Sequence, residues 1–480
     1  MLFNSYSFLF FFFLIVSIYY LIAPKYRWIV LLAASYYFYM AWKANFIILI
    51  IISTLVDYYC GIKISESYNN STRKKFIYIS LVTNLGLLFV FKYFNFFTES
   101  LYDFLHIIGL GVEPKSFNLI LPVGISFYTF QTLSYTIDIY YNRTKPEKHL
   151  GIFALFVSFF PQLVAGPIER SSRLIPQLKE HVSLRYENIR NGFMLIMWGL
   201  FKKILIADRL AEYVNQVFNH PDQYQGLQNI IAAFFFSIQI YCDFSGYSDI
   251  AIGAALVLGI RLMRNFRQPY LATSFKDHWS RWHISLSTWF RDYLYIPLGG
   301  NKVVKWRFYY NIFIVFLVSG LWHGANWTFV AWGALHGTFL VLENIAVPYI
   351  KNFKTNIGFD HFPKFDRFIS RVLIFSLVIL FFVVFRANNI VDAWNIINGM
   401  FAINIDQLNV QVYSYRIDLY LSFALIGILF VFDIVDNKIG IKSLIYDSSK
   451  AVKWLAFVFM LVSIALFGKF NEIDFLYFQF

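Results

Sequence analysis

The stretch YSFLFFFFLIVSIYYLIAP (residues 6–24) carries no charged side chain and approaches the length of about 20 apolar residues that crosses a bilayer. It lacks the basic n-region and the small-residue cleavage site of a secretory signal peptide, so we interpret it as a retained first span. Comparable apolar runs recur as far as Leu466. The sequence therefore predicts an all-α polytopic membrane protein.

The composition of the whole chain supports this interpretation. Of the 480 residues, 58% are hydrophobic and only 14% are charged, whereas a soluble domain carries roughly 25% charged residues. No linker-like break rich in Pro, Ser or charge divides the chain, so we expect one membrane domain over residues 1–480. The predicted spans number about 11 to 12 and lie near 7–23, 28–41, 45–60, 76–94, 117–141, 191–207, 229–260, 308–321, 325–347, 370–389, 418–436 and 453–468.

The basic residues that give the chain its formal net charge of +13 cluster in alternate loops of this predicted topology. Lys and Arg concentrate in loops 61–75, 142–149, 169–190, 261–307 and 437–453, and they are sparse in loops 95–116, 208–228 and 402–417. The positive-inside rule assigns the first group to the cytoplasm and the second to the outside, which explains the charge without nucleic-acid binding. Residues 151–166 lie between two basic loops, so we expect a re-entrant or half-buried helix there.

Cysteine and histidine spacings give no sign of a metal site. The two cysteines, Cys60 and Cys242, have no metal-type spacing. His278 and His283 are five residues apart and lack the i,i+4 spacing that would place two ligands on one helix face. A zinc site needs three or more converging ligands, so we predict no metal.

Five stretches carry more polar and small residues than lipid contact allows: 121–141, 159–170, 237–253, 276–300 and 319–337. In the first of them, Gln131, Ser134 and Asp138 fall on one helix face with Tyr135. Hydrogen bonds between helices explain single residues of this kind. All five stretches together predict a polar cavity inside the bundle, where ionisable groups are functional candidates.

The fourth stretch, KDHWSRWHISLSTWFRDYLYIPLGG (276–300), is predicted to form one amphipathic helix at the cytoplasmic face. Trp279, His283, Ser287 and Arg291 recur every four residues and form one stripe. We expect Asp277 to form a local i,i+4 ion pair with Arg281 in the next turn.

Nine histidines occur in the chain, and five of them lie in polar loops, where a solvated side chain is the expected state. The other four lie in or against apolar segments: His278, His283, His323 and His336. With an unperturbed pKa of about 6.5, an imidazole can take up and return a proton near neutrality. These four residues are therefore the main candidates for catalysis.

These motifs resemble the membrane-bound O-acyltransferase family, and most closely its bacterial branch of alginate and peptidoglycan O-acetyltransferase membrane subunits. The most specific motifs are RWHISLSTWFRDYLYIPLGG (281–300) and GLWHGANWTFVAWGALHG (320–337). The other matching motifs are LPVGISFYTFQTLSYTIDIY (121–140), FFPQLVAGPIER (159–170), QIYCDFSGYSDIAIG (239–253) and FLYFQF (475–480). The resemblance spans nearly the whole chain.

The resemblance implies a helical bundle pierced by a tunnel, with a catalytic core at about 117–347. It implies that His323 is the catalytic histidine and His283 the second characteristic histidine of the family. We expect His323 to act as a general base on the acceptor hydroxyl. His278 stands where the branch usually has another residue type, and we expect it to lie outside the shared chemistry. The supporting candidates are Asn326 (oxyanion contact or structural hydrogen bond), Asp243 and Asp249 (fixing a histidine tautomer), Trp322 and His336.

The resemblance also implies the substrates and the partner. The expected donor is acetyl-CoA, with no further cofactor, and the expected acceptor is an extracytoplasmic polysaccharide, reached through a periplasmic or extracellular partner of the SGNH hydrolase class. The expected location is the bacterial cytoplasmic membrane. Candidates for binding the phosphates of the donor are Arg264, Arg267, Arg281 and Arg291, although retention of basic loops in the cytoplasm also explains these charges.

Two alternatives remain open from the sequence. The first is the teichoic-acid D-alanyl transfer subunit, a relative that takes its acyl group from a carrier protein. The second is a secondary transporter, which would also place polar residues in a polytopic bundle. Transporters usually show internal repeats, and none is visible here.

Overall fold

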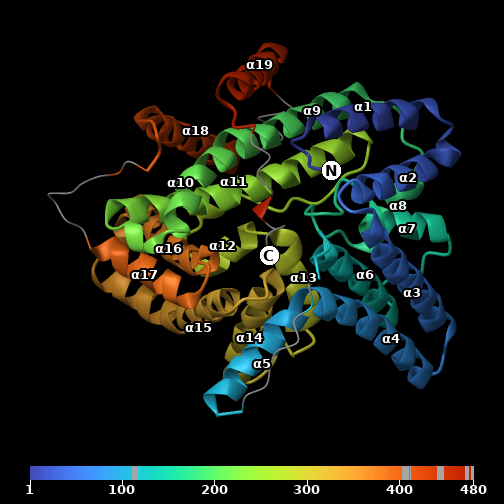
Figure 1. Cartoon of the computed structure of the whole chain (residues 1–480), viewed down its shortest axis with the longest axis horizontal. Helices are drawn as coiled ribbons and strands as arrows, with labels where there is room; N and C mark the ends of the chain where they lie inside the picture. Colours follow the sequence, from blue (N-terminus) through green and yellow to red (C-terminus); the bar gives the residue numbers. More distant parts are fainter. Residues whose placement is uncertain are drawn as a thin grey trace. The chain divides into compact units, whose positions relative to one another are not determined.

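A computed structural model describes residues 1–110, 117, 119–402, 410, 412–440, 448–470 and 475–476 (Figure 1). Within these residues all regular structure is helical, which confirms the predicted fold class. Parts of the predicted loops 95–116, 402–417 and 437–453, and residues 477–480 of the FLYFQF motif, lie outside the described residues.

The chain divides into two compact units. Unit 1 contains Met1–Ile196 and Tyr247–Met263, and unit 2 contains Met197–Gly246 and Arg264–Phe480. The helices of unit 1 are α1 (Tyr6–Leu21), α2 (Arg27–Met40), α3 (Ile47–Glu66), α4 (Asn70–Leu88), α5 (Phe94–Ile107), α6 (Ile125–Tyr140), α7 (Leu150–Ser158) and α8 (Ser171–Lys179). Two helices belong to both units, α9 (Tyr186–Leu200) and α11 (Leu227–Val257).

The helices of unit 2 include the two most specific motifs, 281–300 and 320–337. They are α10 (Asp208–Phe218), α12 (Phe275–Arg281), α13 (Ile284–Phe290), α14 (Lys305–His323), α15 (Trp327–Asn356), α16 (Pro363–Arg386), α17 (Ile390–Phe401), α18 (Arg416–Ile439) and α19 (Lys450–Phe467). A π-helical turn, Arg291–Tyr295, continues α13.

Seven helical segments among the described residues are long and apolar enough to cross a membrane: Ala44–Glu66, Asn70–Ile107, Leu227–Val257, Trp327–Asn356, Pro363–Arg386, Arg416–Ile439 and Lys450–Phe467. Other predicted spans correspond to shorter helices, such as α1 with 16 residues and α2 with 14. The predicted re-entrant stretch 151–166 contains only the nine-residue helix α7. At 1.5 Å per residue, such a helix is too short to cross the bilayer.

Hydrogen bonds inside unit 1 satisfy the polar face of α6. The Gln131 side chain donates to the Phe156 carbonyl at 2.6 Å, and the Tyr135 hydroxyl accepts from the Glu147 amide at 3.0 Å. At the next residue, the Thr136 hydroxyl donates to the buried carboxylate of Asp57 at 3.1 Å. This polar stretch is therefore used for interhelical hydrogen bonding, the alternative that the sequence left open for it.

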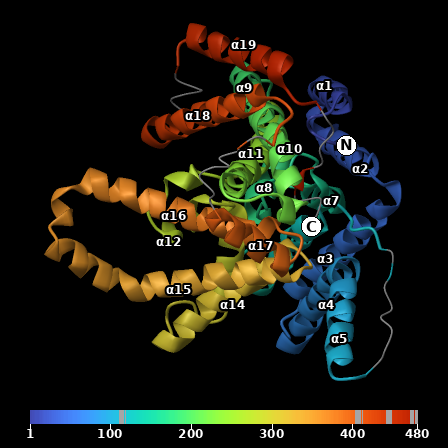
Figure 2. The same cartoon turned by 60° about the vertical axis from the view of Figure 1, so that its left-hand side comes forward.

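Close packing of α14 against α15 sets the frame of unit 2. The two helices form a hairpin and run side by side, and α16 follows α15 (Figure 2). Gly320 on α14 and Gly333 on α15 lie at the crossing, where a methyl group on Gly333 would stand 3.1 Å from the Gly320 Cα. Small residues permit this approach of the two backbones. It fixes the positions of His323 at the end of α14 and His336 on α15.

The predicted single helix over 276–300 is wrong, because α12 ends at Arg281 and α13 begins at Ile284. Between them His283 adopts a left-handed backbone conformation with φ of 42°. The physical reason is tertiary hydrogen bonding by Asn265. Its carbonyl accepts from the Ile284 amide at 2.9 Å, and its side chain accepts from the Ser285 amide at 3.3 Å. The break removes His283 from the predicted stripe and buries it completely.

Candidate functional site

The imidazole of His283 lies in the interior of unit 2. Its ring centroid is 4.6 Å from that of Phe244 on α11 and 6.0 Å from that of Trp322 on α14. Burial lowers the pKa of His283 to about 3, because the charged imidazolium would lose its hydration. The side chain is therefore neutral at physiological pH, and a neutral imidazole can donate one hydrogen bond without carrying charge.

His323 is the last residue of α14, and its side chain is 3% exposed. The Trp322 ring lies 5.0 Å from the His323 ring, as well as next to His283. The two histidines that the family resemblance singled out thus contact one indole, His283 from the turn before α13 and His323 from the end of α14. His283 and His323 are 40 residues apart in the sequence, and the fold brings both of them to the Trp322 ring.

His336, on α15, extends this cluster. The Trp332 ring lies 5.1 Å from the ring of His323 and 4.6 Å from the ring of His336. The Trp279 Nε1–H donates a hydrogen bond to His336 Nδ1 at 3.3 Å. Neither Trp332 Nε1 nor His336 Nε2 has a hydrogen-bond partner among the described residues. A buried donor without a partner costs about 1–3 kcal/mol, so these two atoms favour a polar ligand or water in the site.

A pocket of about 460 Å³ lies beside this cluster, among α12, α13, α14, α15 and the π-helical turn. Its lining residues are Lys276, Trp279, Leu286, Ser287, Phe290, Arg291, Tyr295, Asn301, Phe308, Ile312, Val315, Phe316, Ser319, Leu340 and Asn344. Four of them are exposed and polar and form the mouth: Lys276, Arg291, Asn301 and Asn344.

The inner end of the pocket is buried and mostly apolar. Leu286 and Ser319 line it and are 1% and 4% exposed. Leu286 lies one helical turn after His283, and Ser319 lies one turn before His323. The pocket thus runs from a basic, exposed mouth towards the segments that carry both histidines.

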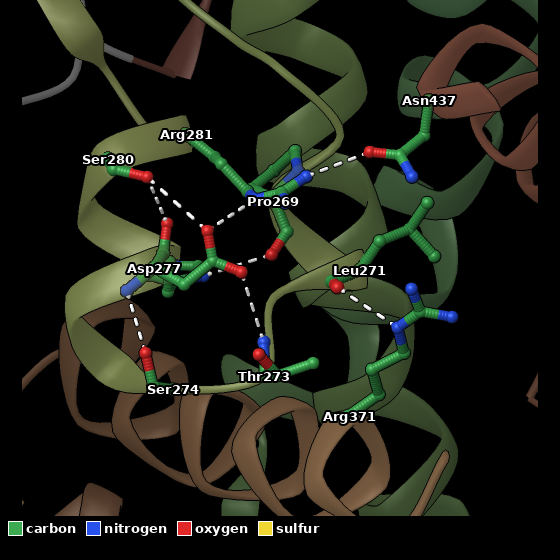
Figure 3. Close-up of polar contacts among 10 residues, drawn as sticks. Pro269, Leu271, Thr273, Ser274, Asp277, Ser280, Arg281, Arg371 and Asn437 are labelled. Carbon is green, nitrogen blue, oxygen red and sulfur yellow. Dashed lines mark hydrogen bonds and ion pairs between the residues drawn. The ribbon is translucent and has the colours of Figure 1, made fainter. Parts of the chain in front are cut away.

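Among the four candidate donor-binding arginines, Arg291 alone lines this pocket. Arg281 forms the predicted ion pair with Asp277 at 2.7 Å and donates to the Asn437 side chain at 3.0 Å (Figure 3). Arg264 pairs with Asp436 at 2.6 Å. Arg267 is exposed and does not belong to the lining.

Lys276 was missed by sequence reasoning, although it precedes Trp279 by three residues and so shares its helix face. Figure 3 shows the adjacent polar network, in which the Thr273 amide and the Arg281 side chain both donate to the Asp277 carboxylate. This network fixes α12 and with it the mouth of the pocket.

Two supporting candidates have structural partners. Asp243 is buried, with one oxygen 2.7 Å from Lys203 Nζ and the other accepting from the Leu476 amide at 2.9 Å. Asn326 is the N-cap of α15, because its side chain accepts from the Thr328 amide at 2.9 Å. The Asn326 amide group also donates to the Asn388 carbonyl at 3.1 Å.

The remaining two candidates are placed as follows. Asp249 belongs to unit 1. His278 is buried, and its Nδ1 lies 3.3 Å from the Pro269 carbonyl. Burial lowers the pKa of His278 to about 4. In the described part of the chain, no three side chains of His, Cys, Asp or Glu converge in a way that could hold a metal ion.

Comparison with known proteins identifies the family of the chain. Residues 37–386 match the model of the membrane-bound O-acyltransferase family. The chain is 40% identical to the probable alginate O-acetylase AlgI of Azotobacter vinelandii, over 84% of this chain and 78% of that protein. It is 36% identical to the peptidoglycan O-acetyltransferase of Helicobacter pylori, over 84% and 80%.

A more distant likeness is to the teichoic acid D-alanyltransferase of Bacillus subtilis, with 29% identity over 49% of this chain and 62% of that protein. The long match to the family model includes both histidine motifs and the helices that carry them. The chain therefore belongs to the membrane-bound O-acyltransferase family and is a multi-pass membrane acyltransferase.

Proposed function

We propose that the protein transfers an acetyl group from cytoplasmic acetyl-CoA, across the membrane, for O-acetylation of an extracytoplasmic polysaccharide. The observation that carries the proposal is the pocket, which leads from Lys276 and Arg291 at an exposed mouth to a buried end one turn away from His283 and His323. Cations at the mouth suit the phosphates of CoA, and the apolar interior suits its pantetheine arm. The identity to acetyltransferases of alginate and peptidoglycan supports an acetyl group as the group transferred and a polysaccharide as the class of acceptor.

The reaction follows from the two imidazoles. His323 accepts the proton of the acceptor hydroxyl while the hydroxyl oxygen attacks the thioester carbonyl carbon. The C–S bond then breaks, and the His323 imidazolium returns the proton to the departing thiolate. An ester and free CoA result. General base catalysis of this kind contributes about 10²–10⁴-fold. The neutral imidazole of His283 is suited to donate a hydrogen bond to the carbonyl oxygen as negative charge develops.

A separate protein is needed to reach the polysaccharide. Helices α5 and α10 occupy the first parts of the predicted outer loops 95–116 and 208–228, so these two segments are not simple loops. Together with 402–417, each segment is about 20 residues long, whereas an independent domain takes at least about 50. We propose a partner of the SGNH class on the outer face of the bacterial cytoplasmic membrane, which passes the acetyl group to the polymer.

The test uses membranes that contain the protein, its native partner and labelled acetyl-CoA. His323→Ala should insert and fold normally and lose at least about 10²-fold in ester-linked label on the polysaccharide. His220→Ala, which removes an exposed histidine from the same unit, is the matched control and should retain activity. Normal labelling by His323→Ala would refute the catalytic assignment.

The same membranes separate the alternatives. The likeness to the Bacillus subtilis protein is the reason to test D-alanyl transfer. That reaction predicts that label is transferred from a D-alanyl carrier protein and that none is transferred from acetyl-CoA. A transporter predicts accumulation of solute in sealed vesicles without any thioester cleavage.

A further inference from the structure

We propose that Trp279, held in place by His336, limits the acyl group that the pocket accepts to the length of acetyl. The inference rests on the proposed donor site. Trp279 and Phe316 both line the pocket, and their ring centroids lie 4.8 Å apart, so together they form one wall of it. Behind that wall its ring contacts His336 at 5.1 Å and Trp332 at 5.8 Å. The indole thus separates the pocket from the buried aromatic cluster of α15.

A single hydrogen bond fixes the orientation of this indole. Its Nε1–H donates to His336 Nδ1 at 3.3 Å, and His336 is 1% exposed. The His336 ring is itself held between Phe381, at 4.9 Å, and Phe275, at 5.7 Å. Rotating Trp279 away would leave the buried His336 Nδ1 acceptor without its donor, at the cost of the desolvation of that group. The wall is therefore stiff as well as bulky.

The acyl group is the part of the donor that meets this wall. CoA phosphates belong at the mouth with Lys276 and Arg291, so the pantetheine arm points inward and its thioester reaches the buried end near Ser319. The acyl carbons extend beyond the thioester. Each carbon added to acetyl must then displace packed side chains, and one methylene in an apolar pocket discriminates by about 10–200-fold.

Removing the indole should open space towards His336 and Trp332. Trp279→Ala removes the whole wall. Trp279→Phe keeps an aromatic ring but is smaller and lacks the Nε1–H, so it tests the inference even if the alanine variant fails to fold. His336→Leu removes the acceptor that anchors the indole, whereas His336→Asn can keep an acceptor close to the position of Nδ1.

The experiment measures binding, so that it does not depend on turnover. Purified full-length protein in nanodiscs is titrated calorimetrically with non-hydrolysable thioether analogues of acetyl-, propionyl-, butyryl- and hexanoyl-CoA. The wild-type protein should prefer the acetyl analogue. Trp279→Ala should raise the affinity for the butyryl analogue relative to the acetyl analogue by about 10-fold or more.

The other variants complete the test. Trp279→Phe and His336→Leu should shift the preference towards the propionyl analogue, and His336→Asn should keep the wild-type order. Trp394→Ala removes an indole that is 63% exposed on α17 and is the matched control. Unchanged butyryl-to-acetyl ratios in both Trp279 variants would overturn this inference alone. A wild-type protein that binds none of the analogues would overturn the proposed donor site and this inference with it.

Discussion

Replacing Gly333 by alanine should disable the enzyme without touching a catalytic side chain. The added methyl group would stand 3.1 Å from the Gly320 Cα and still closer to the Phe316 carbonyl oxygen. Because carbon atoms pack at about 3.5–4.0 Å, α14 and α15 must separate by roughly 1 Å. Overpacking of this size costs about 1–3 kcal/mol of stability. Since α14 ends at His323, the same shift displaces the proposed base.

The displacement of His323 predicts how far the rate of acetyl transfer should fall. A misplacement of about 1 Å at reacting groups costs about 10²-fold, so acetyl transfer by Gly333→Ala should fall by that factor while the protein still inserts. The assay combines label transfer from acetyl-CoA with the thermal midpoint of the purified protein in detergent. Gly427→Ala on α18 is the control, because a methyl group there has no atom within 4 Å. Equal rates and equal midpoints in the two variants would refute the reasoning.

Three further predictions concern the neighbourhood of the site. Asn326→Ala should lower the free energy of unfolding by about 1 kcal/mol through loss of the α15 cap and leave the turnover rate nearly unchanged. A loss of turnover of about a hundredfold or more at unchanged stability would instead indicate an oxyanion contact. Arg291→Ala should raise KM for acetyl-CoA at low salt and weaken its salt dependence, and a KM unaffected at every salt concentration would exclude a role at the mouth. Because burial lowers the pKa values of His278 and His283 to about 4 and about 3, the unfolded chain binds more protons below about pH 6.5. Each histidine should therefore remove about 2 kcal/mol of stability between pH 7 and pH 5, and a denaturation midpoint that does not fall over this interval would contradict their neutral burial.

Hydropathy was sufficient to predict a helical membrane protein, because repeated apolar runs near 20 residues match the thickness of a bilayer. The motifs around His283, His323 and His336 were sufficient to select these histidines as candidates. Their separation in sequence exceeds 50 residues in total, and the contacts of Trp322 and Trp332 that join them depend on how three helices pack. Periodicity within one segment carries no information on that packing.

Hydrogen bonds between residues far apart in the sequence explain what the sequence could not predict about the neighbourhood of the candidate site. The four-residue spacing around His283 predicts one continuous helix, but two hydrogen bonds to Asn265 end α12 and start α13. For Asn326 the sequence left an oxyanion contact and a structural hydrogen bond open, and its side chain bonds to the Thr328 amide and to the Asn388 carbonyl, 62 residues away. Asp243 pairs with Lys203, which is 40 residues away in the chain. Local propensity does not encode partners at such distances.

The backbone of His283 affects how any substitution there will be interpreted. At φ of 42° an alanine would be strained by about 1–2 kcal/mol, so its phenotype would mix a distorted start of α13 with a missing ring. Asparagine enters this region of the Ramachandran map more readily and could keep the main-chain path. Comparison of the alanine and asparagine replacements would therefore separate what the polypeptide conformation contributes at this position from what the heterocycle contributes.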